Sequence, residues 1–364
     1  MKLFTDFTDS SRHKEKISIF VFDYYLKKLQ FKNVGFYQKE LLIGINAIKK
    51  GSLLAQAVAK GFLSENTLEK RDRSPVTVAD YGVQTVVMSE IRKAFKDSLF
   101  VAEEDSSDLE DPSNRDLLEK LGTFVQEQVP DLNTDDILKI LKTGQHGGGS
   151  EGAFWTLDPI DGTKGFIRRQ QYALALAYIV NGEVVLGILA CPNLPVTGSN
   201  TGGSLYYGVK NQGAFMMDLS REKRTSISCQ KINNPNDANF CESVESGHSS
   251  HECSQKIAEL LGVNSPPLRM DSQCKYATVA RGEASIYLRL PTNKNYEEKI
   301  WDHAAGALIV QEAGGLVDDI EGKPLDFSSG KTLKANRGVV ASCAGINDAV
   351  KNAVKNVLHK HPNP

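Results

Sequence analysis

FWTLDPIDGT, residues 154–163, is the stretch on which the interpretation of this chain depends. Its apolar residues predict a buried strand, and the strand ends in Asp158 and Asp161, with Pro159 fixing the backbone between them. Two carboxylates so close together repel each other unless a cation lies between them. The pattern therefore predicts a hard metal ion, such as Mg²⁺, held by oxygen ligands.

Two neighbouring groups extend this predicted metal site. The carbonyl of Ile160 could supply a further oxygen beside Asp158 and Asp161. The hydroxyl of Thr163 follows on a turn whose backbone N–H groups could hold a phosphate. The alternative is a strand followed by an Asp-Gly turn, in which the aspartates only stabilise the chain reversal. This stretch alone does not decide between the two, so the rest of the chain has to.

The composition is that of an ordinary soluble globular protein with room for two domains: 364 residues, of which 40% are hydrophobic and 24% charged. A formal net charge of -2 argues against a general nucleic-acid-binding protein. No apolar stretch is long enough to predict a membrane span. The six cysteines have neither Cys-x-x-Cys nor zinc-type spacing, so mostly buried thiols in a reducing compartment are expected. A regulatory disulfide stays open, because sequence does not show distances between cysteines.

Residues 1–36 differ in character from the rest of the chain, and we expect an unstructured, dispensable N-terminal extension. They carry no signal-peptide cleavage pattern, and they contain acids such as Asp6 and Asp23, which transit peptides avoid. A cytoplasmic location is therefore expected, with plastid or mitochondrion as the alternatives. From Gln38 to Phe62 apolar residues recur at helical spacing, which predicts a long amphipathic helix packed against a sheet.

Asp80 follows the segment SPVTVA at residues 74–79. A turn is expected there, followed by a short extended piece and then a helix from about Gln84 to Phe95. A carboxylate at a helix entrance is a good N-cap, so capping is the structural explanation for Asp80.

Two further acidic groups follow the same pattern. Glu103 and Glu104 end a short apolar strand that starts at Ser98, and Asp302 opens a predicted helix of small residues that runs to Ala313. Taken singly, the glutamates could form a solvated turn and Asp302 could be a cap. Acids at so many strand ends and helix starts are harder to explain one by one, which favours the metal site.

The remaining patterns predict two domains. An Asn-Gly pair at 181–182 divides the longest apolar segment and predicts a β-hairpin. A stretch at 193–203 rich in Pro, Gly, Ser and Asn is taken as the boundary. It separates an α+β domain at 37–195, with an antiparallel sheet and most metal ligands, from an α/β domain at 196–364. In the second domain strands and helices alternate, which predicts a largely parallel or mixed sheet.

Three segments together make the sequence recognisable: DPIDGT at 158–163, Glu103-Glu104, and WDHAAG at 301–306. In residue type, order and spacing they resemble the signatures of the inositol monophosphatase superfamily, which comprises Mg²⁺-dependent, lithium-sensitive phosphomonoesterases. The resemblance runs from about Tyr37 to the C-terminus. It implies a layered α-β-α-β-α sandwich that combines an α+β and an α/β half.

Within that superfamily the chain is most similar to the 3′(2′),5′-bisphosphate nucleotidases of plants and fungi. The supporting segments are SPVTVADY at 74–81, GHSSH at 247–251, DSQCKY at 271–276 and IYLRLP at 286–291. The resemblance implies a phosphatase that converts adenosine 3′,5′-bisphosphate to AMP and phosphate, and that also accepts the sulfated precursor and inositol 1,4-bisphosphate. An inositol polyphosphate 1-phosphatase is the alternative enzyme, and a non-catalytic nucleotide-binding regulator is the alternative of a different class.

The same resemblance implies the roles of individual residues. Metal would be bound by Glu103, Asp158, the Ile160 carbonyl, Asp161 and Asp302. The attacking water would be activated by Asp80 with Thr163. The substrate would contact Thr163, His248, Ser272, Lys275, Arg289 and Asp302. From the residues alone, His248 could be a cap or packing residue, and Lys275 and Arg289 could be exposed charges.

The implied partners are small phosphorylated molecules, without a nucleic-acid polymer or a membrane, for a monomer or homodimer. Two features depart from the family pattern: the extension at 1–36, and Cys274, which stands where a small apolar residue is expected. Neither removes a functional group, and they bear only on localisation and on thiol sensitivity.

Overall fold

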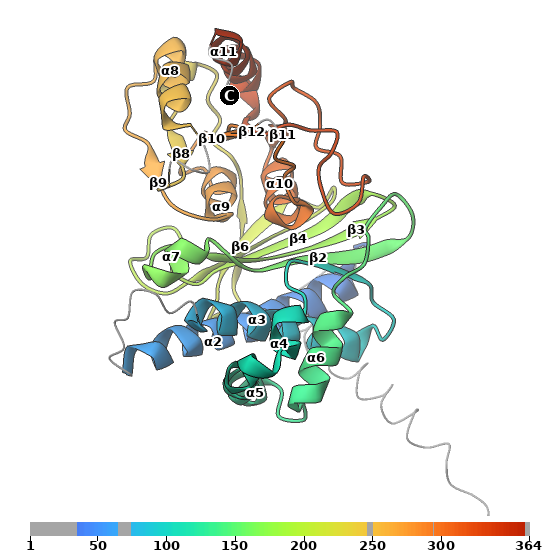
Figure 1. The fold of residues 1–364 in the computed structure, drawn as a ribbon. Coiled ribbons are helices and arrows are strands. Elements are labelled where there is room, and N and C mark those ends of the chain that lie inside the picture. The colour runs from blue at the N-terminus through green and yellow to red at the C-terminus, as the bar shows by residue number, and fades with distance from the viewer. Residues whose placement is uncertain (1–34, 65–73, 246–249, 294, 361–364) are drawn as a thin grey trace, which may run out of the picture.

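The computed structural model describes residues 35–64, 74–245, 250–293 and 295–360. Helices and sheets alternate in layers (Figure 1). Helices α2 (Gln38–Ser64) and α3 (Ser74–Ala94) cover one face of the larger sheet, and α9 (Cys274–Ala280) and α10 (Ala304–Glu312) lie between the two sheets. Helices α8 (His251–Leu261) and α11 (Asn347–Lys360) lie beyond the smaller sheet. The predicted α-β-α-β-α sandwich is confirmed.

The larger sheet has seven strands in the order β1-β2-β3-β4-β5-β6-β7. Strand β1 is parallel to β2, and the other neighbouring pairs are antiparallel. The predicted hairpin joins β3 to β4, and both turn residues, Asn181 and Gly182, have positive φ, as a tight hairpin turn requires. The strands are β1 Phe100–Ala102, β2 Ala153–Asp161, β3 Ala173–Val180, β4 Glu183–Cys191, β5 Ser204–Val209, β6 Ala214–Asp218 and β7 Arg224–Ile227.

The structure corrects the domain boundary predicted after residue 195. Strands β5, β6 and β7 follow that point in the chain, yet they extend the first sheet. The stretch at 193–203 is a connection between the antiparallel neighbours β4 and β5, and its turn-forming residues serve that reversal. The second sheet starts only with β8 at Phe240.

The smaller sheet is mixed, as predicted, with the order β11-β12-β10-β8-β9. Strand β8 is parallel to β9 and β10, whereas β12 is antiparallel to β10 and β11. The strands are β8 Phe240–Glu242, β9 Leu268–Arg269, β10 Ile286–Arg289, β11 Gly315–Asp318 and β12 Val339–Cys343.

Helix α3 starts ten residues earlier than predicted, at Ser74 rather than about Gln84. The expected extended piece is therefore absent from the described residues, and Asp80 lies inside the helix instead of capping it. The reason is burial: Val78, Ala79 and Val83 are fully buried in the helical layer. Packing of this apolar face outweighs the weak helix propensity of the valines.

Helix α2 confirms the predicted long helix. By length and composition, Gln38–Gly61 could cross a membrane, but 61% of that window is buried in the fold, as in a core helix. It packs against α3, β3 and β4. Below this layer lie α4 (Ser107–Glu110), α5 (Arg115–Gln128) and α6 (Thr134–Lys142).

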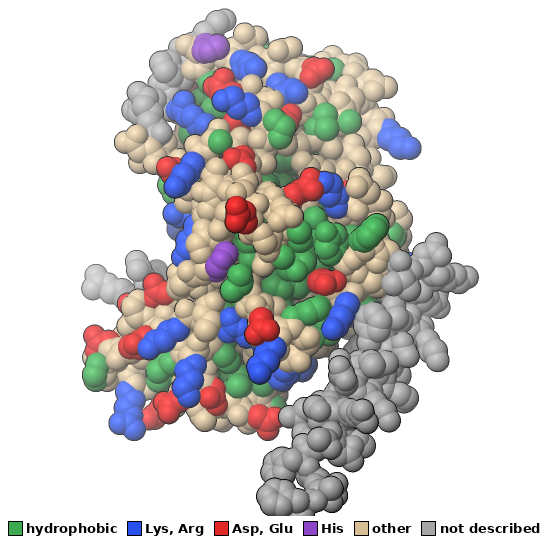
Figure 2. Space-filling model, turned by 90° about the vertical axis from the view of Figure 1, so that its right-hand side faces the viewer, with side chains coloured by type: hydrophobic (Ala, Val, Ile, Leu, Met, Phe, Trp, Pro, Cys, Tyr) green, Lys and Arg blue, Asp and Glu red, His purple; other side chains and the backbone are tan. Residues whose placement is uncertain are grey.

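The middle layer lies unusually close to the larger sheet. A Cβ added at Gly187 on β4 would be 2.7 Å from the Ala305 carbonyl oxygen on α10, so only glycine permits this approach. All six cysteines are free and buried, which confirms the expected buried thiols. Figure 2 shows one face of the molecule, on which apolar side chains gather in the middle and the described charges of both signs are intermixed without a basic stripe.

Candidate active site

Nine of the predicted site residues line one cavity of about 500 Å³. It lies where β2 and β10 end and where the segments leading into α9 and α10 approach them. Five of its lining residues are the predicted metal ligands: Glu103, Asp158, Ile160, Asp161 and Asp302. Four more are the predicted catalytic and substrate-binding residues Thr163, Ser272, Lys275 and Arg289. His248 lies outside the described residues.

A β-bulge brings Asp158 and Asp161 to the same cavity. Asp158 pairs with Ala175 and Asp161 with Ala173, so three steps on β2 oppose two on β3. In a regular strand, residues three apart point to opposite faces. The extra residue removes that alternation, and both carboxylates line the cavity. They are thus not merely part of an Asp-Gly turn, because β2 continues through Asp161 and α7 (Thr163–Ile167) follows directly after Gly162.

Four acids line the cavity and are called the acid cluster below: Glu103, Asp158, Asp161 and Asp302. Their mutual repulsion is electrostatically unfavourable without a cation. Burial, together with repulsion by Glu103 and Asp161, raises the pKa of Asp158 well above its ordinary value. Glu103 is open to the cavity, yet the protein around its carboxyl group removes much of its contact with bulk water. This desolvation, together with repulsion by Asp302 and Glu104, raises the pKa of Glu103 to about 8. Removal from water also raises the pKa of Asp161 and Asp302, against the opposing attraction of nearby cations.

The residues present fit a hard metal ion. Oδ1 of Asp158 is buried and has no hydrogen-bond partner, an arrangement that costs about 1–3 kcal/mol if nothing compensates it. The carboxyl groups of Glu103 and Asp158 lie within hydrogen-bonding reach, which requires a shared proton or a bound cation. All the available donors are oxygens, the ligands that Mg²⁺ prefers.

A second acidic group lies beside this cluster but has protein partners of its own. The possible ligand atoms of Glu298, Asp302 and His303 lie within 4.8 Å of one another. However, His303 Nε2 lies 3.1 Å from Glu298 Oε2, and its Nδ1 lies 2.8 Å from the Tyr276 hydroxyl. Both ring nitrogens of His303 are thus occupied. Of these three residues, only Asp302 is left to hold a metal ion together with Glu103, Asp158 and Asp161.

Lys275 and Arg289 are not exposed surface charges, so that alternative is wrong. Lys275 is 4% exposed, and its Nζ donates a 3.4 Å hydrogen bond to the Met270 carbonyl. Burial lowers the pKa of Lys275, while attraction by Asp161 opposes the shift. Arg289 pairs with Glu298 at 2.7 Å and lies 4.0 Å from Asp302. Two cations therefore line the same cavity as the predicted metal-binding acids.

Asp80 is buried on α3 and is not among the residues that line the cavity. Burial, then repulsion by Glu104 and Glu103, raises its pKa well above the ordinary value for an aspartate. Helix α3 packs against α7, the helix that Thr163 starts. The pairing of Asp80 with Thr163 stays a prediction.

Sequence reasoning missed Gln273 and Glu298, which also line the cavity. Both lie within or beside segments that the sequence singled out: Gln273 in DSQCKY, and Glu298 four residues before Asp302. The available signals were an amide inside a predicted substrate-binding segment and an acid close to a predicted metal ligand. Two aromatic residues, Tyr287 and Tyr296, also line the cavity.

A model of the inositol monophosphatase family matches residues 38–358. A curated 3′(2′),5′-bisphosphate nucleotidase of Schizosaccharomyces pombe is 41% identical over 346 residues, covering 90% of this chain and 98% of the relative. One from Oryza sativa is 42% identical over 341 residues, covering 88% and 95%.

Solved structures show the same fold. An IMPase of Thermotoga maritima superimposes with a TM-score of 0.59 at 21% identity, covering 89% of this chain and 99% of that one. An inositol monophosphatase from Anabaena gives a TM-score of 0.53 at 19% identity, covering 87% and 97%. At these identities the likeness concerns the fold alone.

Proposed function

Since the chain belongs to the inositol monophosphatase family, as its sequence predicted, we propose that it is a metal-dependent phosphatase that hydrolyses the 3′-phosphate of adenosine 3′,5′-bisphosphate. One observation carries the proposal: the acid cluster and two cations, Lys275 and Arg289, line a single cavity. Curated relatives named 3′(2′),5′-bisphosphate nucleotidase, about 40% identical over most of the chain, support the choice of substrate.

Mg²⁺ is the proposed cofactor, and oxygen donors would hold it: Glu103, Asp158, the Ile160 carbonyl, Asp161 and Asp302. When bound, Mg²⁺ supplies charge neutralisation at the transferring phosphoryl group and acidifies a coordinated water. The protein contributes the fixed geometry: the bulge in β2 aims Asp158 and Asp161 at the same space. Uncatalysed hydrolysis of phosphate monoesters is very slow, so positioning and charge stabilisation are what the site must provide.

Asp80 is the proposed general base, acting through the Thr163 hydroxyl. An aspartate of ordinary pKa is a poor base near neutral pH, and burial raises the pKa of Asp80 above that ordinary value, which makes the carboxylate more basic. The Thr163 hydroxyl can accept a proton from the attacking water while donating its own toward Asp80. Packing of α3 on α7 supports this relay.

Lys275 and Arg289 are proposed to bind the second phosphate. A buried ammonium has three N–H donors, and the Met270 carbonyl at 3.4 Å uses only one weakly, which leaves capacity for an anion. Arg289 keeps its charge through the pair with Glu298. Ser272, at the same cavity, is proposed to contact the substrate as well. The two cations would offset the charge that a bisphosphate carries into an acidic site.

The accompanying substrates are proposed to be the sulfated precursor of this nucleotide and inositol 1,4-bisphosphate. The second candidate function is an inositol polyphosphate 1-phosphatase. Tyr287 and Tyr296 favour the nucleotide, because aromatic side chains in the cavity wall offer a surface to a purine base. The cytoplasmic location and the monomeric or homodimeric state stay predictions.

The test is phosphate release from adenosine 3′,5′-bisphosphate and inositol 1,4-bisphosphate, compared at equal concentrations with Mg²⁺ and with Li⁺ added. We expect preference for the nucleotide, dependence on Mg²⁺ and inhibition by Li⁺. Faster release from the inositol phosphate would replace the proposal with the second candidate. Release from neither would favour a binding protein without catalytic activity.

A further inference from the structure

We propose that Gln273 is a positioning residue that sets the distance between the segments carrying Asp161 and Asp302, and thereby the affinity of the acid cluster for a metal ion. The inference rests on the proposed function, and it concerns a residue outside the DPIDGT and WDHAAG segments that bear those two acids.

Gln273 makes hydrogen bonds to both segments at once. Its backbone N–H donates to Asp161 Oδ2 over 2.5 Å. Its side-chain Nε2 donates to the Trp301 carbonyl over 2.9 Å, and its Oε1 accepts from the Gly306 N–H over 3.1 Å. Trp301 and Gly306 flank Asp302 on either side. A single residue, 2% exposed, therefore connects the end of β2 to the start of α10.

The segment that carries Gln273 is fixed at its N-terminal side. Ser272 has a φ of 69°, a conformation that costs energy for a serine and persists only where neighbours enforce it. Ser272 packs closely against Gly162, and only glycine permits this approach, because a Cβ at position 162 would lie 2.8 Å from the Ser272 Cβ. Asp271 pairs with Arg168 at 2.5 Å. The turn before α9 is thus held against the same strand end that bears Asp161.

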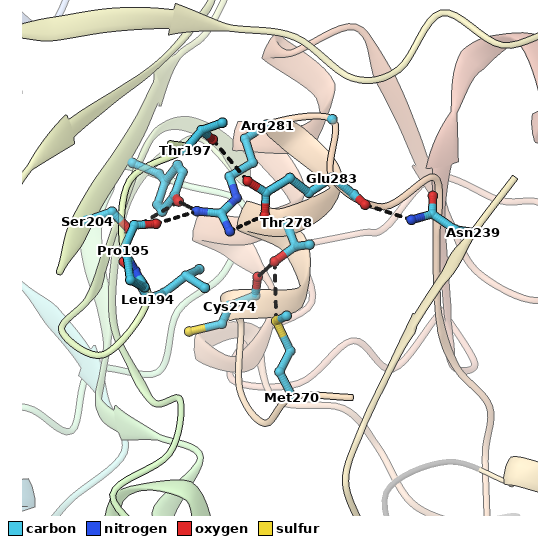
Figure 3. Close-up of polar contacts among 12 residues, drawn as sticks. Leu194, Pro195, Thr197, Ser204, Asn239, Met270, Cys274, Thr278, Arg281 and Glu283 are labelled. Carbon is cyan, nitrogen blue, oxygen red and sulfur yellow. Dashed lines mark hydrogen bonds and ion pairs between the residues drawn. The ribbon is translucent and has the colours of Figure 1, made fainter. Parts of the chain in front are cut away.

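The far end of α9 is fixed as well (Figure 3). Arg281 donates to the Pro195 carbonyl over 2.8 Å and to the Tyr206 hydroxyl over 2.7 Å, and it pairs with Glu283. These contacts tie α9 to β5 and to the connection before it. Because α9 is fixed at both ends, it cannot shift to follow the metal-binding segments, and Gln273, directly before it, sets their separation.

An amide is suited to this position for a chemical reason. It can donate to a carbonyl and accept from an N–H at the same time, whereas a carboxylate can only accept and a methyl group can do neither. It is also uncharged, so it adds no further repulsion to the acid cluster. Ligand-orienting groups of this kind typically change metal affinity without touching the ion.

The test is Mg²⁺ binding to the full chain by isothermal titration calorimetry, without substrate. We expect Gln273→Met and Gln273→Ala each to weaken Mg²⁺ binding by about 10-fold or more, a typical loss when a ligand-orienting partner is removed. Gln273→Met keeps most of the volume, so it guards against a folding defect in the alanine variant.

The matched control is Thr278→Val. Thr278 is also buried on α9, and its hydroxyl donates to the Cys274 carbonyl over 2.8 Å and contacts Met270 Sδ at 3.2 Å (Figure 3). The Thr278→Val variant should unfold at a lower urea concentration than the wild type, while its affinity for Mg²⁺ should be unchanged. Unchanged affinity in both Gln273 variants would overturn the proposal, and so would an equal loss in Thr278→Val. If the wild-type chain bound no Mg²⁺, the metal-dependent function itself would fall with it.

Discussion

The guanidinium Nε of Arg289 lies 2.7 Å from Glu298 Oε2, so a cation that lines the cavity is paired with an acid on the chain leading to Asp302. The same carboxylate oxygen lies 3.1 Å from His303 Nε2. Burial would raise the pKa of Glu298, but hydrogen bonding and attraction by His303 and Arg289 outweigh it and lower the pKa to about 2. Glu298 is therefore charged at every pH at which the protein is expected to work, and it orients Arg289.

Glu298→Gln is expected to destabilise the fold and weaken substrate binding. Loss of the charge leaves Arg289 with a weaker partner, which should cost about 1–3 kcal/mol in the free energy of unfolding at neutral pH. The KM for the bisphosphate should rise more than kcat falls, because Glu298 acts through Arg289. Urea denaturation and steady-state kinetics check the two effects.

The pH dependence of that stability loss follows from the sign of the pKa shift. In the folded chain the pKa of Glu298 lies below its ordinary value of 4.5. The contribution of its charge to the free energy of unfolding is therefore fully present above pH 4.5 and is lost as the pH falls toward about 2. The difference between wild type and Glu298→Gln should therefore narrow across that window. A constant difference from pH 6 down to pH 2 would contradict the assignment of the charge.

Asp158→Asn is expected to abolish metal-dependent turnover while leaving the fold intact. Loss of a directly binding carboxylate should lower kcat by about 100-fold or more. The metal-free variant should be as stable as the wild type or more so, since one buried negative charge is removed from the cluster. Asp116→Asn, at an exposed position on α5, is the control and should behave like the wild type. Near-normal activity in Asp158→Asn would contradict the metal assignment.

Lys275→Ala is expected to discriminate between substrates. Removal of a charge-assisted hydrogen bond to the second phosphate should cost about 1.5–3 kcal/mol, or about 10- to 100-fold in KM for the bisphosphate. A simple phosphate monoester lacks the second phosphate and should be affected much less. Equal increases in KM for both would mean that Lys275 does not contact that phosphate.

Mg²⁺ is expected to stabilise the folded chain. At about 100 times its dissociation constant, a ligand that binds only the folded state adds about 2.7 kcal/mol to the free energy of unfolding. Thermal or urea unfolding with and without Mg²⁺ measures this gain, which should be absent in Asp158→Asn. Equal stabilisation of the variant would show that the ion binds elsewhere.

Much of the site could be predicted because its chemistry is concentrated in short segments. In DPIDGT the acids, the proline and the glycine are neighbours in sequence, and their residue types already indicate metal and phosphate chemistry. The sandwich followed from the family resemblance, and the mixed second sheet from the alternation of strands and helices. The start of α3 at Ser74 could not be predicted, because burial of its valines outweighed their local preference.

The sequence by itself determined which chemical groups are present, namely the acids that favour a metal ion and the cations Lys275 and Arg289. It also determined the family to which the chain belongs. Only the tertiary structure decided how they meet. The bulge in β2 turns Asp158 and Asp161 to one cavity, and Gln273 reaches Asp161 across 112 residues of chain. Register and contacts between distant segments depend on how whole layers pack, and no local pattern of residues records that.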